Sequence, residues 1–159
     1  MPDGIIATSA PADAMPPRIV LDTNVWLDLL VFDNPRRAEL REAMHLGEVL
    51  AVTNSACREE WIRVLRYPIL RLDPPAIESL EQAFDAIAHD WSAAGTEEPG
   101  LPRCSDPDDQ KFLQLAHDAG ARWLLSRDRA VLALARRCRR EGRFAILPPE
   151  AWPSPAGTS

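Results

Sequence analysis

A short apolar run that ends in a carboxylate is the feature that most restricts how this chain can fold. Ile19-Val20-Leu21 leads directly into Asp22, and the small polar residues Thr23 and Asn24 follow. An apolar run of this length suits a strand that is buried on both faces of a parallel sheet. Ligands of open α/β sheets bind at the carboxyl ends of the strands, where Asp22 would suit a metal ion. On this stretch alone, a helix cap at Asp22 explains the residue equally well.

Short apolar runs alternate with longer amphipathic stretches along the chain. After a first strand at about 18–22, this pattern predicts strands at 49–52, 123–125 and 144–147, and at most a short one near 101–104. It predicts helices at about 25–30, 35–46 and 55–65, from 74 onward, from 106 to Gly120, and at 131–140, with Ser55 and Asp106 as caps. The expected architecture is a three-layer α/β/α sandwich around a parallel sheet of four or five strands, with the first strand at its centre.

The length and the proline-rich ends predict one domain between two tails. A chain of 159 residues is typical of a single domain. Residues 1–17 contain four prolines among small residues, and we expect a flexible tail there. The domain is then expected at 18–150, and residues 151–159 form a C-terminal tail.

Charge, cysteines and hydropathy limit the classes of function. The formal net charge of −6 argues against a generally basic nucleic-acid coat, but it allows a local acidic metal site that acts on nucleic acid. The three cysteines lie far apart with no Cys-x-x-Cys, which indicates reduced thiols. No apolar run approaches the roughly 20 residues of a membrane helix, and no signal peptide is evident. We therefore expect a cytoplasmic protein without a membrane partner.

Four carboxylates occupy comparable places in the expected sheet. Asp22 ends the first strand, Glu60 lies on the helix after the second, Asp109 lies in the first turn of the fifth helix, and Asp128 follows the strand at 123–125. Such positions can converge at the carboxyl edge of a parallel sheet. Close carboxylates repel one another unless a cation lies between them, and oxygen ligands favour Mg²⁺ or Mn²⁺. Such ions position phosphate and activate water, so the pattern indicates phosphodiester hydrolysis.

Each of these carboxylates also has an explanation without chemistry. Aspartates are favoured in the first turn of a helix by the helix dipole, which accounts for those at 106, 108 and 109. Asp128 would cap the last helix, and Glu59 with Glu60 would form a solvated face. The basic run 136–140 suits either RNA phosphates or a solvated helix end.

The motifs, taken in order, resemble the PIN domain nucleases over about residues 18–150. The sequences of these motifs are most similar to those of the PIN branch that contains the toxins of toxin–antitoxin systems. The resemblance is carried by Ile19-Val20-Leu21-Asp22-Thr23-Asn24, by Glu60-Trp61-Ile62-Arg63-Val64-Leu65 with Pro68, by Asp106-Pro107-Asp108-Asp109-Gln110-Lys111-Phe112-Leu113 with Ala116, and by Leu124-Leu125-Ser126-Arg127-Asp128.

The resemblance implies a Mg²⁺- or Mn²⁺-dependent endoribonuclease that takes an RNA substrate, is held by an antitoxin protein and forms a homodimer. Two assignments stay open, because Glu59 could replace Glu60, and Asp106 or Asp108 could contribute beside Asp109. Asn24 and Ser126 would orient carboxylates and waters, although ordinary turn chemistry explains both residues nearly as well. By the resemblance, the residues that coordinate the metal directly or through water are Asp22, Glu60, Asp109 and Asp128.

Three other functions compete with the toxin. A PIN-fold nuclease outside a toxin–antitoxin system would share every motif. A non-catalytic RNA- or protein-binding module would keep the fold, but here all four acidic positions are filled. A phosphatase of the haloacid dehalogenase type needs Asp-x-Asp after its first strand, and Asp22-Thr23-Asn24 lacks the second aspartate.

Overall fold

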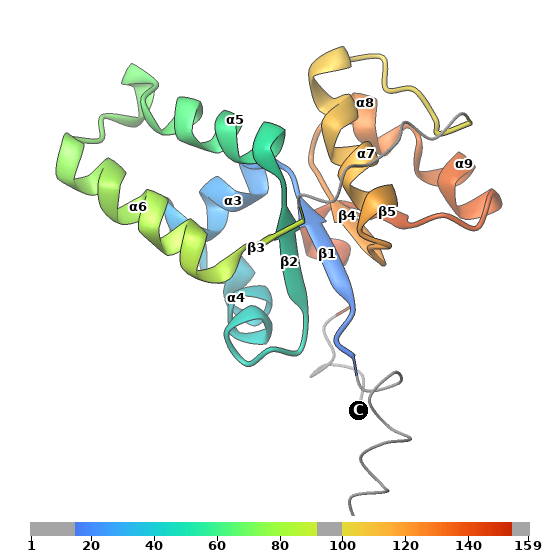
Figure 1. The fold of residues 1–159 in the computed structure, drawn as a ribbon, viewed down its shortest axis with the longest axis horizontal. Helices are drawn as coiled ribbons and strands as arrows, with labels where there is room; N and C mark the ends of the chain where they lie inside the picture. The colour runs from blue at the N-terminus through green and yellow to red at the C-terminus, as the bar shows by residue number, and fades with distance from the viewer. Residues whose placement is uncertain (1–14, 92–99, 154–159) are drawn as a thin grey trace, which may run out of the picture.

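The computed structural model describes residues 15–91 and 100–153, and it contains one five-stranded parallel sheet (Figure 1). The strand order is β3-β2-β1-β4-β5, so the first strand lies at the centre as predicted. It pairs in parallel with β2 on one side and with β4 on the other. The strands are β1 (Arg18–Leu21), β2 (Leu50–Thr53), β3 (His89–Asp90), β4 (Trp123–Leu125) and β5 (Ala145–Leu147).

Helices cover both faces of this sheet, which confirms the three-layer α/β/α sandwich. In Figure 1, α3 to α6 lie on one side of the sheet and α7 to α9 on the other. The helices are α3 (Thr23–Leu30), α4 (Ala38–His45), α5 (Ser55–Leu65), α6 (Pro74–Ile87), α7 (Gln110–Asp118), α8 (Arg129–Leu132) and α9 (Ala135–Arg140). The short 3₁₀ turns are η1 (Pro35–Arg37), η2 (Pro68–Leu70), η3 (Pro107–Asp109) and η4 (Pro149–Ala151).

The central strand divides the core into two clusters. Ile19 and Leu21 belong to the cluster under α3 to α6, whereas Val20 belongs to the cluster under α7 to α9. Successive side chains of a strand point to opposite faces, so an uninterrupted apolar run is needed where both faces are covered. The first cluster is built on aromatic rings, with Phe84 at 4.5 Å from Trp26 and 5.3 Å from Trp61 between ring centroids.

Capping side chains mark the start of α3, α5, α6 and α8. Asp22 caps α3 and accepts a hydrogen bond from the backbone N–H of Val25. The cap of α5 is Asn54, which accepts from the N–H of Cys57, so the prediction of Ser55 as the cap is wrong by one residue. Asp106 is a cap as predicted, but it caps the 3₁₀ turn η3, from which α7 continues.

The predicted secondary structure differs from the structure in further places. Residues 101–104, where the sequence allowed at most a short strand, form neither a strand nor a helix. The fifth strand is instead β3, whose His89 and Asp90 are exposed at the edge of the sheet and carry no apolar signal. The helix expected at 131–140 is two helices, α8 and α9, and β2 begins one residue later than predicted.

The chain after β5 returns to the sheet. The turn η4 brings Trp152 into the core, where its ring lies edge-on to Trp123 with 5.7 Å between centroids. Most of the N-terminal tail expected at 1–17, and residues 154–159 of the C-terminal tail, lie outside the described residues. Within the described ranges, no helix is both long enough and apolar enough to cross a membrane.

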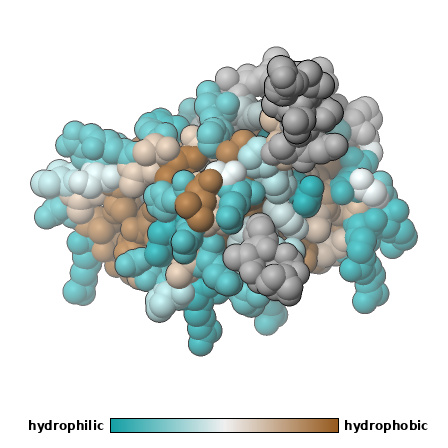
Figure 2. Space-filling model, turned by 90° about the horizontal axis from the view of Figure 1, so that it is seen from below, coloured by the Kyte–Doolittle hydropathy of each residue, from teal (hydrophilic) through white to brown (hydrophobic). Residues whose placement is uncertain are grey.

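The surface is mainly polar, and its apolar part is uneven. Figure 2 shows hydrophobic residues gathering mainly on the half of the molecule that holds α3 to α6. Several large exposed apolar side chains belong to the connections of that half: Phe32 after α3, Leu46 after α4, and Tyr67 with Ile69 between α5 and α6.

Candidate metal centre

Asp22 lies at the carboxyl end of β1 and is held by its whole surroundings. Its backbone N–H donates to the carbonyl of Leu125 on the neighbouring strand, at 3.1 Å. Its Oδ1 accepts from the N–H of Val25 at 3.0 Å, and its Oδ2 accepts from the hydroxyl of Ser126. The side chain is therefore both the cap of α3 and a carboxylate fixed at the edge of the sheet where ligands bind.

Ser126 connects Asp22 to Asp128. Its side chain is completely buried, and its Oγ donates to Asp22 while accepting from the backbone N–H of Asp128 at 3.0 Å. Its own N–H donates to the carbonyl of Leu147 on β5 at 3.0 Å. One hydroxyl group thus sets the relative positions of two of the predicted carboxylates.

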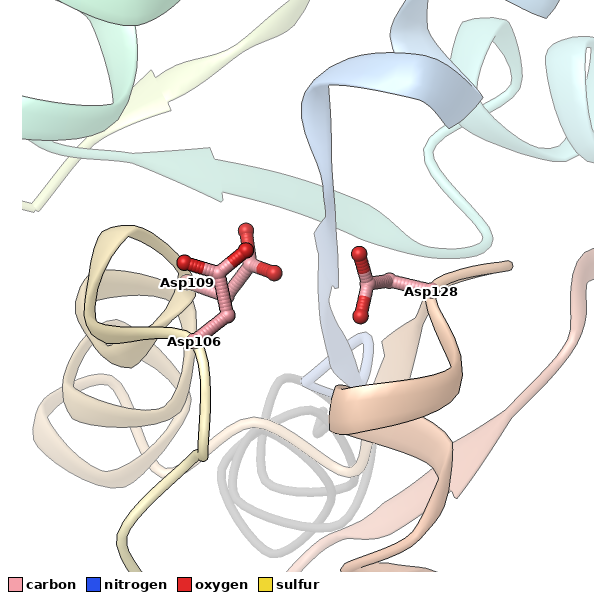
Figure 3. A group of neighbouring side chains, drawn as sticks. All are labelled: Asp106, Asp109 and Asp128. Carbon is pink, nitrogen blue, oxygen red and sulfur yellow. The ribbon is translucent and has the colours of Figure 1, made fainter.

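Two further aspartates, Asp106 and Asp109, converge on Asp128 (Figure 3). Asp128 caps α8, and Asp106 and Asp109 lie at the two ends of the turn that precedes α7. One carboxylate oxygen from each of the three lies within 4.8 Å of the others. Figure 3 shows the side chains of Asp106 and Asp109 pointing toward that of Asp128. The Oδ2 atom of Asp109 is buried and has no hydrogen-bond partner within the described part of the chain.

The site strongly disfavours its own negative charge. Burial raises the pKa of Asp22 from 3.8 to about 6, and the charges of Asp128 and Glu60 act in the same direction against the hydrogen bonds from Ser126 and Val25. Burial also raises the pKa of Asp109 to about 7, together with repulsion from Asp128, Asp106, Asp22 and Glu60. The predicted carboxylates therefore share one electrostatic environment, and a cation between them would relieve it.

Glu60 lies at the edge of this environment and has a cation of its own. It forms an ion pair with Lys111 of α7, and both side chains are largely buried, at 18% and 19% exposure. Lys111 also donates to the carbonyl of Asp108 and lies 5.0 Å from the centre of the Phe112 ring. Sequence reasoning assigned no role to Lys111, although it is the only lysine and lies two residues after Asp109.

The other candidate residues lie outside the three-aspartate cluster. Asp108 and Asn24 are exposed, and Glu59 lines a separate cavity of about 440 Å³ with Arg58 and Asp85. Arg127 precedes Asp128 but forms an ion pair with the buried Asp28 at 2.5 Å. Of the residues left open by the sequence, the structure brings Asp106 into the cluster and leaves Asp108 out of it.

These residues fit a hard divalent cation. The donor set consists of carboxylate oxygens from two segments, the turn η3 and the start of α8, and such oxygens are the ligands that Mg²⁺ and Mn²⁺ prefer. The buried Oδ2 of Asp109 lacks a proton donor among residues 15–91 and 100–153, and a metal ion would supply the partner that this oxygen needs. Asp22, held by Ser126, lies close enough for its charge to act on Asp109.

Comparison with known families agrees with this geometry. A family model described as PIN domain matches residues 18–130, which is most of the chain and includes all four predicted carboxylates. The chain belongs to the PIN domain family. PIN domains are generally nucleases and typically bind divalent metals. No curated protein matches this PIN domain. The sequence prediction of the family and of its sandwich fold is therefore confirmed.

Proposed function

We propose that this PIN domain is a Mg²⁺- or Mn²⁺-dependent endoribonuclease that hydrolyses RNA phosphodiester bonds. The observation that carries the proposal is the convergence of Asp106, Asp109 and Asp128 beside the buried Asp22, with an unpartnered oxygen on Asp109. The pKa values of two carboxylates are raised in this site, which distinguishes it from a solvated acidic surface. Such pKa shifts are concentrated at functional sites.

Some residues of the site would hold the metal ion, and others would orient the carboxylates that hold it. Asp109 and Asp128 would hold the metal ion, Asp22 would add a further carboxylate directly or through water, and Asp106 lies beside them. Ser126 keeps Asp22 in place through its hydroxyl, which also accepts from the N–H of Asp128. A bound Mg²⁺ or Mn²⁺ supplies a water of lowered pKa and positive charge for the phosphate.

The first test is cleavage of a mixed RNA pool by the purified chain with Mn²⁺, with Mg²⁺ or with EDTA. We expect cleavage with either metal and none with EDTA. Asp109→Asn should remove the activity, whereas Asp108→Asn should keep it, because Asp108 lies in the same turn but outside the cluster. Equal activity of the two variants, or cleavage in EDTA, would contradict the proposal.

We further propose that the protein is the toxin of a toxin–antitoxin pair and forms a homodimer. The sequences of the four motifs resemble those of the toxin branch, and this resemblance supports the role as a toxin. Expression of the wild-type chain in a bacterial host should arrest growth, and Asp109→Asn should relieve the arrest. Growth arrest by both the wild type and Asp109→Asn would argue against a toxic nuclease. Light scattering that shows a monomer at all concentrations would argue against the dimer.

The second candidate function is a non-catalytic module that binds RNA or protein. The exposed Phe32, Tyr67 and Ile69 on the α3 to α6 half are the observation that favours it. RNA binding without cleavage, unchanged by Asp109→Asn and by EDTA, would support this module over the nuclease.

A further inference from the structure

Lys111 occupies a place in the site that the proposed chemistry does not explain. It is the only lysine of a chain whose other cationic side chains are arginines and histidines. Its ammonium group pairs with Glu60, one of the carboxylates that the PIN motifs assign to the metal. The metal-free site therefore contains one carboxylate that already has a cationic partner, beside aspartates that repel one another.

The contacts of Lys111 place its ammonium group between Glu60 on α5 and the turn η3 that precedes α7. The group bonds to Glu60 of α5 and to the carbonyl of Asp108, the residue before Asp109, and it lies over the Phe112 ring. The Sγ of Cys57 on α5 contacts the backbone carbonyl of Lys111 at 4.0 Å. These contacts hold α5 close to the start of α7, where the aspartate cluster begins.

We propose that Lys111 is an internal counter-cation that competes with the divalent ion for Glu60, an inference that rests on the proposed metal-dependent function. Ammonium and Mn²⁺ both bind carboxylate oxygens and would share the single negative charge of Glu60, so each weakens the attraction of Glu60 for the other. A lysine suits exchange because its ammonium is a point charge on a flexible stem, whereas arginine holds a carboxylate through two parallel hydrogen bonds. A metal ion that takes Oε1 of Glu60 displaces the ammonium of Lys111 from that oxygen.

A purely structural ion pair makes the opposite prediction. If Lys111 only ties α5 to α7, its loss loosens the start of α7, and metal binding becomes weaker or does not change. If Lys111 competes with the metal, its loss frees Glu60 and removes a positive charge, and metal binding becomes tighter. The direction of the change in metal affinity therefore separates the two roles.

The experiment is a titration of the full chain with Mn²⁺ at low ionic strength, with free Mn²⁺ measured by electron paramagnetic resonance. We expect Lys111→Met to lower the dissociation constant about fivefold, as an ion pair that still keeps about a fifth of its side-chain surface in water is worth about that factor. Lys111→Arg should bind Mn²⁺ no more tightly than the wild type does. Arg66→Met is the matched control, because it breaks the pair with Glu81 between α5 and α6 and should leave the dissociation constant unchanged.

A double-mutant cycle makes the inference specific to Glu60. In a Glu60→Gln background, Lys111→Met should tighten Mn²⁺ binding much less than it does in the wild type, because no carboxylate remains for the two cations to share and only the loss of a positive charge still acts. Lys111→Gln repeats the measurement in case the methionine variant does not fold, as judged by its melting curve. Unchanged or weaker Mn²⁺ binding by the folded variant overturns the inference, as does equal tightening in the Glu60→Gln background.

The result separates this inference from the proposed function. Wild-type protein that binds Mn²⁺ and cleaves RNA, together with a Lys111 variant of unchanged affinity, overturns the inference alone. Wild-type protein that binds no Mn²⁺ at millimolar concentration overturns both.

Discussion

The aspartate side and the glutamate side of the metal centre differ in how their negative charge is compensated. On one side, Asp106, Asp109 and Asp128 converge, and the charged groups that most affect Asp109 are all acidic. On the other side, Glu60 is paired with Lys111. An uncompensated cluster gains most from a divalent ion, whereas a carboxylate that already has a cationic partner gains less. In the proposed metal centre, the aspartate side would provide the affinity for metal and the glutamate side would adjust it.

The largest expected effect follows from loss of a carboxylate on the aspartate side. Asp109→Asn or Asp128→Asn should lower kcat/KM for RNA cleavage at least about 100-fold, since even groups that only support a metal ligand cost 10- to 100-fold. Glu60→Gln should cost about tenfold. A cleavage assay at saturating Mn²⁺ measures all three variants, and a larger loss for Glu60→Gln than for Asp109→Asn would reverse the comparison.

The next effect is stabilisation of the folded protein by metal. A ligand that binds only the folded state, at a hundred times its dissociation constant, stabilises it by about 2.7 kcal/mol. Mn²⁺ should therefore raise the Tm of the wild type, and EDTA should reverse the rise. Asp109→Asn should lose most of this rise, and Glu60→Gln should keep most of it. Equal loss in both variants would show that the two sides bind the ion together.

A similar test applies to Asp22, which belongs to neither side. Asp22→Asn should lose most activity but keep the cap of α3, because the amide oxygen can still accept from the N–H of Val25. The metal-free variant should melt at least as high as the wild type, since a buried charge with a raised pKa has gone. A clear drop in the Tm of the metal-free variant, with full activity, would leave Asp22 as a cap only.

The sequence was sufficient to place Asp22 and Asp128 at the ends of strands, and insufficient to find the cation that pairs with Glu60. Asp22 and Asp128 were found because each follows a buried apolar strand, and the position of such residues depends only on local sequence. The role of Lys111 depends on Glu60, which lies on another helix, and no local pattern joins them. Likewise Asp106 and Asp108 look alike in sequence, and only the turn η3 decides which one points to Asp128.

The fold shows the same division between local and distant causes. β1 and β4 were located well because apolar runs buried on both faces are a strong signal. β3 was missed because an edge strand of two exposed polar residues has no such signal. The break between α8 and α9 was also missed, because no proline or glycine lies in residues 131–140.

A smaller effect is expected from the hydroxyl that joins Asp22 to Asp128. Ser126→Ala removes the donor to Asp22 and the acceptor for the N–H of Asp128, so both carboxylates lose an orienting contact. We expect about a tenfold loss of kcat/KM. Ser126→Thr, which keeps a hydroxyl group, should retain more activity if the buried site admits the extra methyl. Full activity of Ser126→Ala would show that the strands alone position Asp22.

The smallest expected effect is the pH dependence of stability in the metal-free protein. The folded state holds a proton on Asp109 up to about pH 7 and on Asp22 up to about pH 6, whereas the unfolded chain releases these protons near the ordinary value of 3.8. The folded state thus binds more protons between these values, so this contribution to stability is full below pH 3.8 and is lost as the pH rises to about 7.

Melting curves in EDTA across this range measure the effect, and Asp109→Asn isolates the part that comes from the aspartate side. The wild type should lose more stability than Asp109→Asn between pH 4.5 and about pH 7, since the variant has no proton to release at this position. Saturating Mn²⁺ should oppose the trend, because metal binds the deprotonated carboxylates more tightly as the pH rises. Parallel curves for the wild type and Asp109→Asn in EDTA would mean that the repulsion on the aspartate side is already relieved without a metal, and the contrast with the Glu60–Lys111 pair would then disappear.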